Sequence, residues 1–323
     1  MLVPMQRPRI SALALAAALT ACAAPPPAAP ATPYALVLGT AQDAGLPQIA
    51  CREECCEAAR RDPDRRRLVA SVLIVDPRSG SRWLIDATPD LAEQVERARG
   101  HGVMRPAQHG RAPLFDGIFL THAHLGHVTG LLQLGPEAYA SGTVPVHGSP
   151  RMTEYLKSNG PWSLLVEREH IRPVPMIADQ PLELAPDLSI TALRVPHREE
   201  FTDTYAYLVR GPERTLLCLP DIDKWERWER PITELVAEVD VALLDGSFFA
   251  EGEIPGRSMA EIPHPFMVET MALFAERPAK ERARVRFFHL NHTNPAADPA
   301  GEAAAAVRAA GMFVATEGEI IRL

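Results

Sequence analysis

The chain has 323 residues, of which 46% are hydrophobic and 23% charged, a balance that suits a globular protein with a sizeable buried core. Its 41 acidic residues outnumber its 33 basic ones and give a net charge of −8, so no basic footprint for nucleic acid is present. Composition therefore argues against a nucleic-acid partner. The sequence also contains no repeat at the spacing of a solenoid or propeller.

The N-terminal segment predicts export. Arg7 and Arg9 precede an apolar stretch, residues 10–19, which is too short to span a membrane and is typical of a secretory signal. The stretch runs into Leu-Thr-Ala-Cys, which matches the lipobox of bacterial lipoproteins and implies cleavage before Cys22 and lipid attachment there. A plain signal peptide is the alternative. We therefore expect an exported protein, anchored by lipid to the cell membrane or the outer membrane on the periplasmic side.

The expected domain organisation follows from this segment. Residues 1–21 form the signal peptide, and residues 22–33, almost entirely Ala, Thr and Pro, form an extended tether. Residues 34–323 form the folded domain. Its first predicted strand is Tyr34 to Thr40, which leads into a turn rich in Gly and Pro.

Three cysteines follow this turn, Cys51, Cys55 and Cys56. In an exported protein, a disulfide from Cys51 to one of the other two is one interpretation. A structural zinc ion is the second, and it requires one more nitrogen or sulfur ligand from elsewhere in the chain. Free thiols are the third.

The next segment predicts a β-hairpin followed by a helix. Arg67 to Asp76 and Arg82 to Asp86 are apolar runs separated by a turn, and residues 89–99 have the pattern of a helix. Asp86 closes the second run. Capping of the helix is one role that the sequence offers to Asp86 and to Thr88.

The stretch GIFLTHAHLGHVTGLLQLG contains three closely spaced histidines, His122, His124 and His127. It begins as a buried strand and continues as a helix with one apolar face. On an extended backbone His122 and His124 point to one side, and His127 at the helix start can face the same cleft. Because neutral imidazoles bind zinc well, the spacing predicts a metal site.

The rest of the chain continues the alternation of strands and helices. His147 lies within a predicted strand, so we assign it a structural role, and Cys218 is interpreted as a small core residue. A turn-rich loop at residues 251–266 brings His264 to the cleft as a substrate contact, unless His264 is an exposed loop residue. The expected strands are 144–148, 188–195, 204–210, 214–220 and 241–244, and the expected helices are 150–159 and 225–239.

Three later polar residues, His197, Asp221 and His289, each end an apolar, strand-like run. Such an ordered series of histidines and an aspartate is hard to explain as scattered polar residues of a core. Lys224 follows Asp221 by three residues. It can steady an anionic substrate or be a solvated lysine at the start of a helix.

The residues from Thr121 to His127 resemble the second motif of the metallo-β-lactamase superfamily, Thr-His-Xaa-His-Xaa-Asp-His, except that Gly126 stands where the family has Asp. The three residues at later strand ends follow in the order of the superfamily's later motifs. The resemblance implies an α/β fold, the αββα sandwich of that superfamily.

The resemblance also implies two adjacent metal sites, with zinc as the expected ion and iron or manganese as alternatives. The implied ligands are His122, His124 and His197 for the first ion, His127 and His289 for the second, and Asp221 as a bridge, with Asp86 orienting the metal-binding loop. Without a carboxylate at position 126, the second site is expected to be weaker. Asp43, in the turn after the first strand, is considered as a substitute.

The strings GLPQIACREECCEAAR and HLNHTNP resemble one branch of the superfamily, which contains pyrroloquinoline quinone biosynthesis protein B and the carbon–phosphorus lyase phosphodiesterase. In that branch cysteines and a histidine hold a structural zinc ion, which implies the ligands Cys51, Cys55, Cys56 and His292 here. The sequence departs from the branch in having Glu53 at the middle position and an additional cysteine, Cys55.

Together these features favour a metal-dependent hydrolase in which a zinc-activated hydroxide attacks a phosphodiester or a small ester. Asp221, His264 and Lys224 are the candidate catalytic residues. An iron-dependent redox enzyme or accessory protein related to quinone cofactor biosynthesis is the second hypothesis, and a non-catalytic, lipid-anchored scaffold is the third. Retention of both histidines of the first site favours the hydrolase. The expected partners are a small-molecule substrate and the membrane, and a homo-oligomer stays open.

Overall fold

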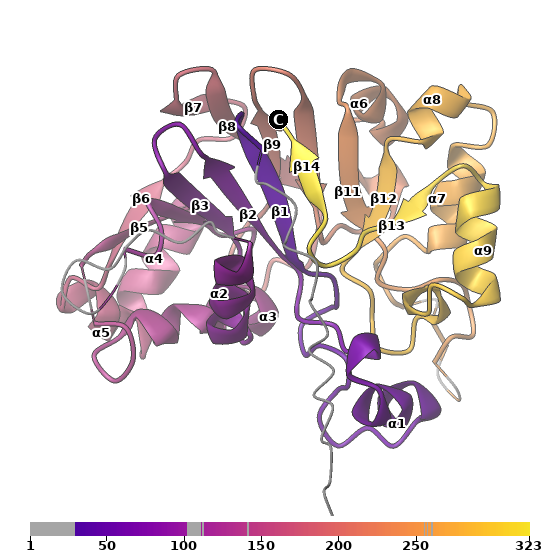
Figure 1. The fold of residues 1–323 in the computed structure, drawn as a ribbon, viewed down its shortest axis with the longest axis horizontal. Coiled ribbons are helices and arrows are strands. Elements are labelled where there is room, and N and C mark those ends of the chain that lie inside the picture. The colour runs from indigo at the N-terminus through magenta and orange to yellow at the C-terminus, as the bar shows by residue number, and fades with distance from the viewer. Residues whose placement is uncertain are drawn as a thin grey trace, which may run out of the picture.

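The computed structural model describes residues 30–101, 111, 113–140, 142–254, 256, 258–259 and 261–323. The predicted signal peptide, Cys22 and most of the predicted tether lie outside these residues. Among the described helices, none is both long and apolar enough to cross a lipid bilayer. The described chain forms two seven-stranded sheets with helices on their outer sides (Figure 1).

The first sheet is organised around β2, whose sequence SVLIVD is buried along its whole length. Leu73 faces a core shared with helices, whereas Ile74 faces the second sheet, which explains why the strand is a continuous apolar run. β2 pairs antiparallel with β1 and β3, and the strands from β3 to β6 are parallel. In order across the sheet the strands are β14 (Ile320–Arg322), β1 (Tyr34–Gly39), β2 (Ser71–Asp76), β3 (Ser81–Ile85), β4 (Gly117–Phe119), β5 (Val144–Gly148) and β6 (Ile171–Pro175).

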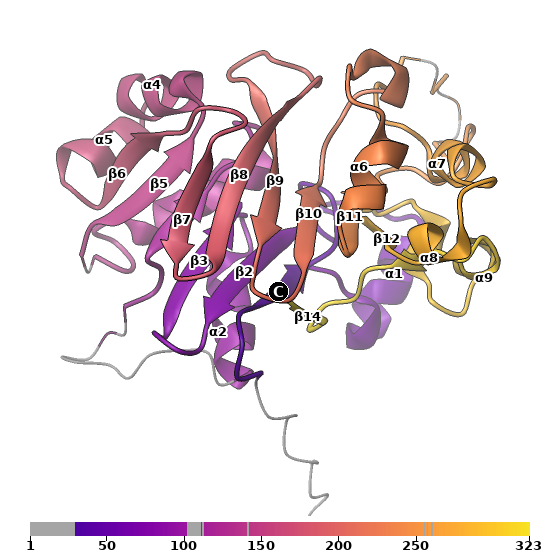
Figure 2. The same cartoon turned by 90° about the horizontal axis from the view of Figure 1, so that it is seen from above.

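The second sheet begins with antiparallel strands and ends with parallel ones. β7, β8, β9 and β10 pair antiparallel in turn, and β10 to β13 are parallel. Figure 2 shows β7 to β11 side by side in this order. The strands are β13 (Phe313–Val314), β12 (Val285–Phe288), β11 (Val241–Asp245), β10 (Thr215–Leu219), β9 (Thr204–Arg210), β8 (Leu188–Val195) and β7 (Pro181–Ala185).

Three apolar cores separate four layers. One core lies between the first sheet and α2, α4 and α5, the second lies between the sheets, and the third lies between the second sheet and α6, α7 and α9. This arrangement matches the predicted αββα sandwich. The α-helices are α1 (Glu54–Arg61), α2 (Leu91–Gly100), α3 (Leu125–Val128), α4 (Pro150–Ser158), α5 (Trp162–Glu167), α6 (Ile232–Glu238), α7 (Met267–Leu273), α8 (Ala279–Arg282) and α9 (Glu302–Ala309), and the 3₁₀ helices are η1 (Pro63–Arg65), η2 (Thr129–Leu134), η3 (Trp225–Arg227) and η4 (Pro295–Ala297).

Two helix predictions are wrong in extent. The expected helix at 225–239 is interrupted, because Pro231 has no N–H to donate and disfavours helical backbone at the residue before it. The chain instead forms η3 and begins α6 at Ile232. The helix expected after the three histidines is also shorter than predicted, because its α-helical part is limited to α3 and the 3₁₀ helix η2 follows it. Gly130 N–H donates to Ala87 O, 2.8 Å away, instead of continuing the helix.

Most other predicted elements have the expected bounds within one or two residues. β5, β8 and β9 agree fully, and α4 begins at Pro150, where Ser149 Oγ accepts from Met152 N at 3.0 Å. Cys218 is buried in β10, as predicted. The sequence did not predict α1, α5, α7, α8, α9, β6, β7, β13 or β14.

Two strands end in residues with an unusual backbone. Asp86 directly follows β3 and His289 directly follows β12, and both have a left-handed backbone, with φ of 63° and 61°. Non-glycine residues adopt this conformation infrequently, and it turns the side chain away from the alternation of the strand. One strand end from each sheet therefore redirects a polar side chain toward the junction of the two sheets.

Candidate metal centre

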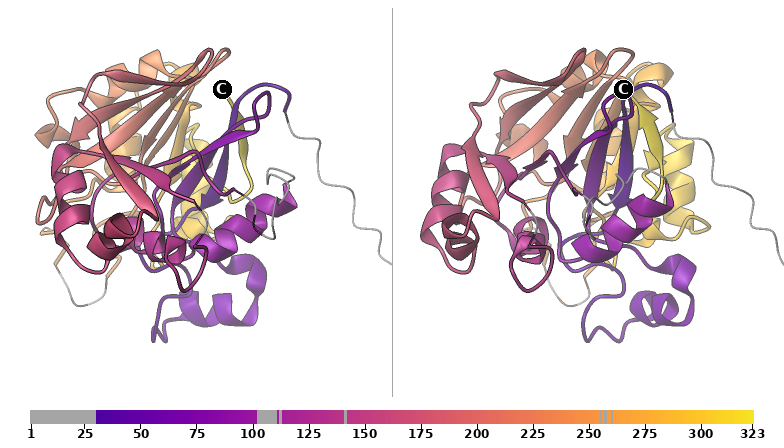
Figure 3. Two further views of the ribbon diagram at one scale, coloured as in Figure 1. Left: turned by 90° about the vertical axis from the view of Figure 1, so that its left-hand side faces the viewer. Right: turned by 60° about the vertical axis from the view of Figure 1, so that its left-hand side comes forward.

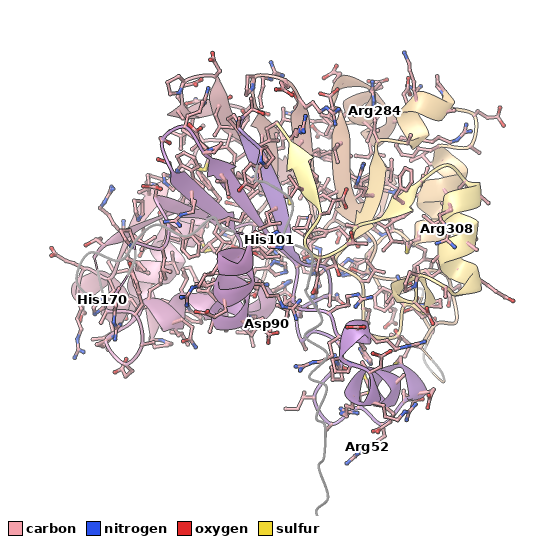
Figure 4. All side chains as sticks on the ribbon, viewed as in Figure 1. Arg52, Asp90, His101, His170, Arg284 and Arg308 are labelled. Atoms are coloured by element: carbon pink, nitrogen blue, oxygen red, sulfur yellow. The ribbon has the colours of Figure 1, made fainter. Side chains whose placement is uncertain are left out.

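Six of the chain's eleven histidines converge with two aspartates. Within the described residues, the sets whose ligand atoms lie within 4.8 Å of one another are His122–His124–His197, Asp43–His127–His289, His122–His127–Asp221 and His197–Asp221–His264. We call these eight residues the histidine cluster. By contrast, His101 lies beside α2 and His170 lies at the outer edge near α5 (Figure 4), so histidine content alone does not locate the site.

Asp221 lies in the middle of the histidine cluster and is 3% exposed. Its Oδ2 is 3.0 Å from His127 Nε2, 3.2 Å from His289 Nε2 and 3.9 Å from His122 Nε2, and its Oδ1 is 3.8 Å from His197 Nε2. Burial acts to raise the pKa of Asp221, but the surrounding imidazoles hold it well below its usual value. The cluster therefore has an ionised carboxylate at its centre.

Each histidine of the cluster has one ring nitrogen next to a polar partner. These pairs are His122 Nδ1 with Thr121 Oγ1 (3.0 Å), His127 Nδ1 with Asp86 Oδ2 (2.7 Å), His289 Nδ1 with Ser247 Oγ (3.2 Å), His264 Nδ1 with Asp245 Oδ2 (2.7 Å), His197 Nδ1 with Asp223 Oδ1 (3.4 Å) and His124 Nε2 with Glu200 Oε2 (3.1 Å). Partners of this kind orient the rings of metal-binding histidines and select their tautomer.

Most of the ring nitrogens and carboxylate oxygens that face the centre of the cluster lack a hydrogen-bond partner. Those that are buried without a hydrogen-bond partner in the described chain are Nε2 of His127, His197 and His289, Oδ1 of Asp43 and Oδ2 of Asp221. One outer pair is an exception to the contrast, because His197 Nδ1 and Asp223 Oδ1 lie 3.4 Å apart without forming a hydrogen bond. His122 Nε2 and His124 Nδ1 face each other at 2.7 Å. An unpaired buried polar atom costs about 1–3 kcal/mol, so several of them directed at one region fit a set of ligands for a cation. Imidazole nitrogens and carboxylate oxygens are the donors that zinc accepts.

Asp86 lies where the sequence analysis placed it, behind the ligand loop. Its carboxylate accepts from Thr121 N at 2.8 Å, from Thr121 Oγ1 at 2.9 Å and from His127 Nδ1 at 2.7 Å. Both oxygens are thus used to hold the loop and one ring. Thr88 does not cap α2, because Asp90 is the residue before the helix and no side chain makes a capping bond there. Thr88 Oγ1 instead accepts from Asp90 N at 3.2 Å and donates to Gln94 Oε1 at 2.9 Å.

His264 is buried, 4% exposed, and belongs to the cluster rather than to an exposed loop. Burial acts to lower its pKa, but the adjacent carboxylate of Asp245 outweighs burial and raises the pKa to about 9. Asp245 also accepts from Ile222 N at 3.1 Å and from Ser247 N at 2.9 Å. One carboxylate thus fixes His264 and the peptide that follows Asp221.

Asp245, Asp223, Glu200 and Ser247 were not predicted as site residues. Asp245 carries a signal that sequence reasoning can use, because it ends a buried strand as Asp221 does. Asp223 follows Asp221 by two residues and faces His197. Glu200 and Ser247 have no comparable signal, since their role depends on which ring they meet in the folded chain.

Lys224 and His147 make their contacts with residues outside the histidine cluster. Lys224 Nζ lies 2.6 Å from Glu269 Oε2 and 3.7 Å from the centre of the Phe266 ring, so its charge is already paired. This contact favours the alternative of a lysine at a helix start over a substrate contact. His147 stacks on Phe119 with 4.6 Å between ring centres, which fits the structural role that the sequence assigned to it.

The thiols of Cys51, Cys55 and Cys56 lie within 4.8 Å of one another and are free. Two of them belong to α1, which lies below the sheets in Figure 1 and in both views of Figure 3. Burial, together with the neighbouring thiols, raises the pKa of Cys56 to about 12. Burial also raises the pKa of Cys55, so Cys55 and Cys56 are neutral thiols unless a cation displaces their protons.

His292 lies near this cysteine cluster but not within ligand distance of all three thiols. Cys55 and His292 line the same surface cavity, and His292 Nδ1 is buried with no hydrogen-bond partner in the described chain. His292 is not within 4.8 Å of all three thiols. Arg52, the residue after Cys51, points away from the sheets (Figure 4) and pairs with Glu57 at 3.2 Å.

Comparison with known proteins agrees with this geometry. The family model described as beta-lactamase superfamily domain matches residues 81–315. Coenzyme PQQ synthesis protein B from Methylobacterium nodulans is 29% identical, over 90% of this chain and 99% of the relative.

Two solved structures share the fold of this chain. The zinc-bound PqqB of Methylobacterium extorquens has a TM-score of 0.75 at 21% identity and covers 90% of this chain and 100% of its own. A diphosphatase from the PhnP family has a TM-score of 0.62 at 20% identity and covers 90% of this chain and 97% of its own. The family model spans most of the chain, and both folds match its two-sheet sandwich, so the chain belongs to the β-lactamase superfamily and has the metallo-β-lactamase fold.

Proposed function

We propose that the chain is a metal-dependent hydrolase that acts on a phosphodiester or a small ester. The observation that carries the proposal is the division of the histidine cluster into oriented outer atoms and unpaired inner atoms. Two similar proteins support it: one is described as zinc-bound and the other as a diphosphatase.

In this proposal the inner atoms hold two ions. The first site consists of His122, His124 and His197, the second site of His127 and His289, and Asp221 is shared between them. Zinc bound there would supply a nucleophile at neutral pH, because it lowers the pKa of bound water to about 7, and it would stabilise negative charge on the substrate. The chain's own contribution is to fix the positions of the ligands through Thr121, Asp86, Ser247 and Asp223.

His264 is the group that we assign to proton transfer. Its Nδ1 donates to Asp245 at 2.7 Å, so Nε2 is the nitrogen that can serve a substrate. With a pKa of about 9, the ring carries a proton at neutral pH. When the phosphorus–oxygen or acyl–oxygen bond breaks, His264 Nε2–H gives its proton to the departing oxygen, and the ring becomes neutral.

A redox function is the second candidate, because the 29% identical relative is a coenzyme PQQ synthesis protein. The two candidates differ in cofactor and in reactant. A redox enzyme of the kind considered needs iron and consumes oxygen, whereas the hydrolase needs only water. Metal analysis of the purified protein, with oxygen uptake measured in parallel, distinguishes them, and iron-dependent oxygen consumption would favour the redox function.

The hydrolase is tested with two phosphodiester reporters that differ only in the leaving group, nitrophenolate or a simple alkoxide. Replacing His264→Gln is expected to lower kcat by about 100- to 10,000-fold for the alkoxide, which needs the proton, and much less for nitrophenolate. His122→Ala removes a ligand and should abolish turnover of both reporters. Full activity and zinc content in His122→Ala would refute the hydrolase, and equal losses on both reporters would remove His264 as the acid.

Asp86 generates a prediction about metal affinity. Asn tolerates the left-handed backbone of residue 86, so Asp86→Asn keeps the turn but loses one of the acceptors that hold His127 and Thr121. We expect zinc binding to weaken about 10- to 100-fold, measured by competition with a chromophoric chelator. The control is Asp64→Asn, the same charge change at an exposed residue. Equal affinities in the two variants would contradict this role.

The cysteine cluster generates a prediction about stability. If Cys51, Cys55, Cys56 and His292 hold a structural zinc ion, replacing His292→Ala should lower the melting temperature by several degrees and remove one zinc ion. Metal affinity at the histidine cluster should stay as in the wild type. An unchanged melting temperature and zinc content, or a disulfide from Cys51 seen by mass spectrometry without reduction, would contradict the structural zinc.

A further inference from the structure

Gly126 stands where the superfamily's motif has an aspartate, and the structure gives a reason for the glycine. A Cβ atom at residue 126 would lie 2.2 Å from Asp43 Oδ1 and 2.5 Å from Asp43 Cα. Real Cβ atoms essentially never approach other atoms so closely, and the second contact is with backbone, which cannot rotate away. Asp43 therefore occupies the space into which a side chain at residue 126 would project.

The carboxylate of Asp43 is directed at the second site. Its Oδ1 lies 3.5 Å from His127 Nε2, and Asp43, His127 and His289 form one of the sets with ligand atoms within 4.8 Å. The side chain as a whole is 42% exposed, yet Oδ1 is buried and has no hydrogen-bond partner in the described chain. One oxygen is thus left to water while the other faces two imidazole nitrogens that are themselves unpaired.

The spacing of these atoms fits a shared ion. Bonds of about 2.0–2.2 Å place two ligand atoms of a tetrahedral zinc ion roughly 3.3 Å apart. The observed separations are 3.5 Å for His127 Nε2 and Asp43 Oδ1, 3.0 Å for His127 Nε2 and Asp221 Oδ2, and 3.2 Å for His289 Nε2 and Asp221 Oδ2. Two imidazoles and two carboxylates complete a four-ligand set with two negative charges.

The backbone around Asp43 is held by the segment that carries His289. Gln42 N donates to Leu290 O at 2.8 Å, and Leu290 N donates to Thr40 O at 2.8 Å, so residues 40–42 pair with the residue after His289. Gly45, with φ of 72°, and its hydrogen bond to Gln42 O at 2.9 Å close the turn that contains Asp43. Asp43 is therefore fixed relative to one of the histidines with which it would share an ion.

We propose that Asp43 supplies the carboxylate ligand of the second site, in place of a carboxylate at residue 126. The inference deepens the proposed metal centre and rests on it. It favours the substitute that was considered from the sequence, Asp43, over a second site without a carboxylate of its own. On this inference Gly126→Asp would displace Asp43 instead of adding a ligand.

The test compares zinc binding in the wild type, Asp43→Asn, Gly126→Ala and the control Asp64→Asn. Zinc per chain is measured by mass spectrometry of the element after dialysis, and affinity by competition with a chromophoric chelator. We expect Asp43→Asn to hold one zinc ion fewer than the wild type, or to bind it at least tenfold more weakly. Gly126→Ala should lose the same ion although it removes no donor, and Asp64→Asn should match the wild type.

Asp43→Asn is nearly isosteric, and circular dichroism and the melting temperature of the metal-free protein check that it folds as Asp64→Asn does. Wild-type zinc content and affinity in Asp43→Asn would overturn the inference alone, as would loss of both ions from the cluster in that variant. Wild-type binding by Gly126→Ala would overturn the claim that glycine makes room for Asp43. A wild type that binds no zinc at the histidine cluster would overturn the proposed hydrolase together with the inference.

Discussion

A buried negative charge, the carboxylate of Asp221, is the constraint on which the surrounding structure depends. Removing an isolated ion from water costs several kcal/mol, and only close, well-oriented partners offset that cost. Here the partners are imidazoles, and each imidazole is in turn held by a hydroxyl or carboxylate on its other side. The site therefore consists of successive polar layers, and an error in an outer layer would misdirect a ring in the inner one.

These layers explain why strand ends carry so many of the polar residues. A charged side chain inside a β-strand that is buried on both faces is costly unless it is paired, whereas a residue at or just beyond the strand end can turn toward the junction of the sheets. Asp86 and His289 do so through a left-handed backbone, and Asp245 does so at the last position of β11. The apolar strands form a rigid frame, and the residues at their ends carry the polar groups of the site.

The sequence predicted the parts of the fold and of the site that depend on local pattern. β5, β8 and β9 were found because burial of their residues gives runs of apolar or alternating character, and the ligand histidines because three of them share one short motif. The helix at 225–239 was overextended because its apolar spacing continues across Pro231, where the backbone cannot.

The residues that the sequence missed depend on contacts between distant segments. Glu200 meets His124 across 76 positions, and Asp245 meets His264 across 19. The sequence suggested Asp43 only because of its position in a loop. Its relation to Gly126 is visible only in the structure, where a Cβ at residue 126 would collide with Asp43. A motif describes neighbours along the chain, whereas a coordination shell is defined in space, so a donor can move to another loop while the shell is kept.

Ala41 forms isolated bridges to Val69, before β2 of the first sheet, and to Leu290, after β12 of the second. The donors of the histidine cluster are divided in the same way, since His127 follows β4 and His289 follows β12. In the proposed site, a metal ion held between them would add a link between two sheets that also meet through apolar side chains and through hydrogen bonds such as Gln42 N to Leu290 O. Binding to the folded state alone adds about 4 kcal/mol when free metal is roughly 1,000 times the dissociation constant. On the proposed function, metal binding would therefore make joint opening of the two halves more costly, and that cost sets how often proteases reach the opened chain.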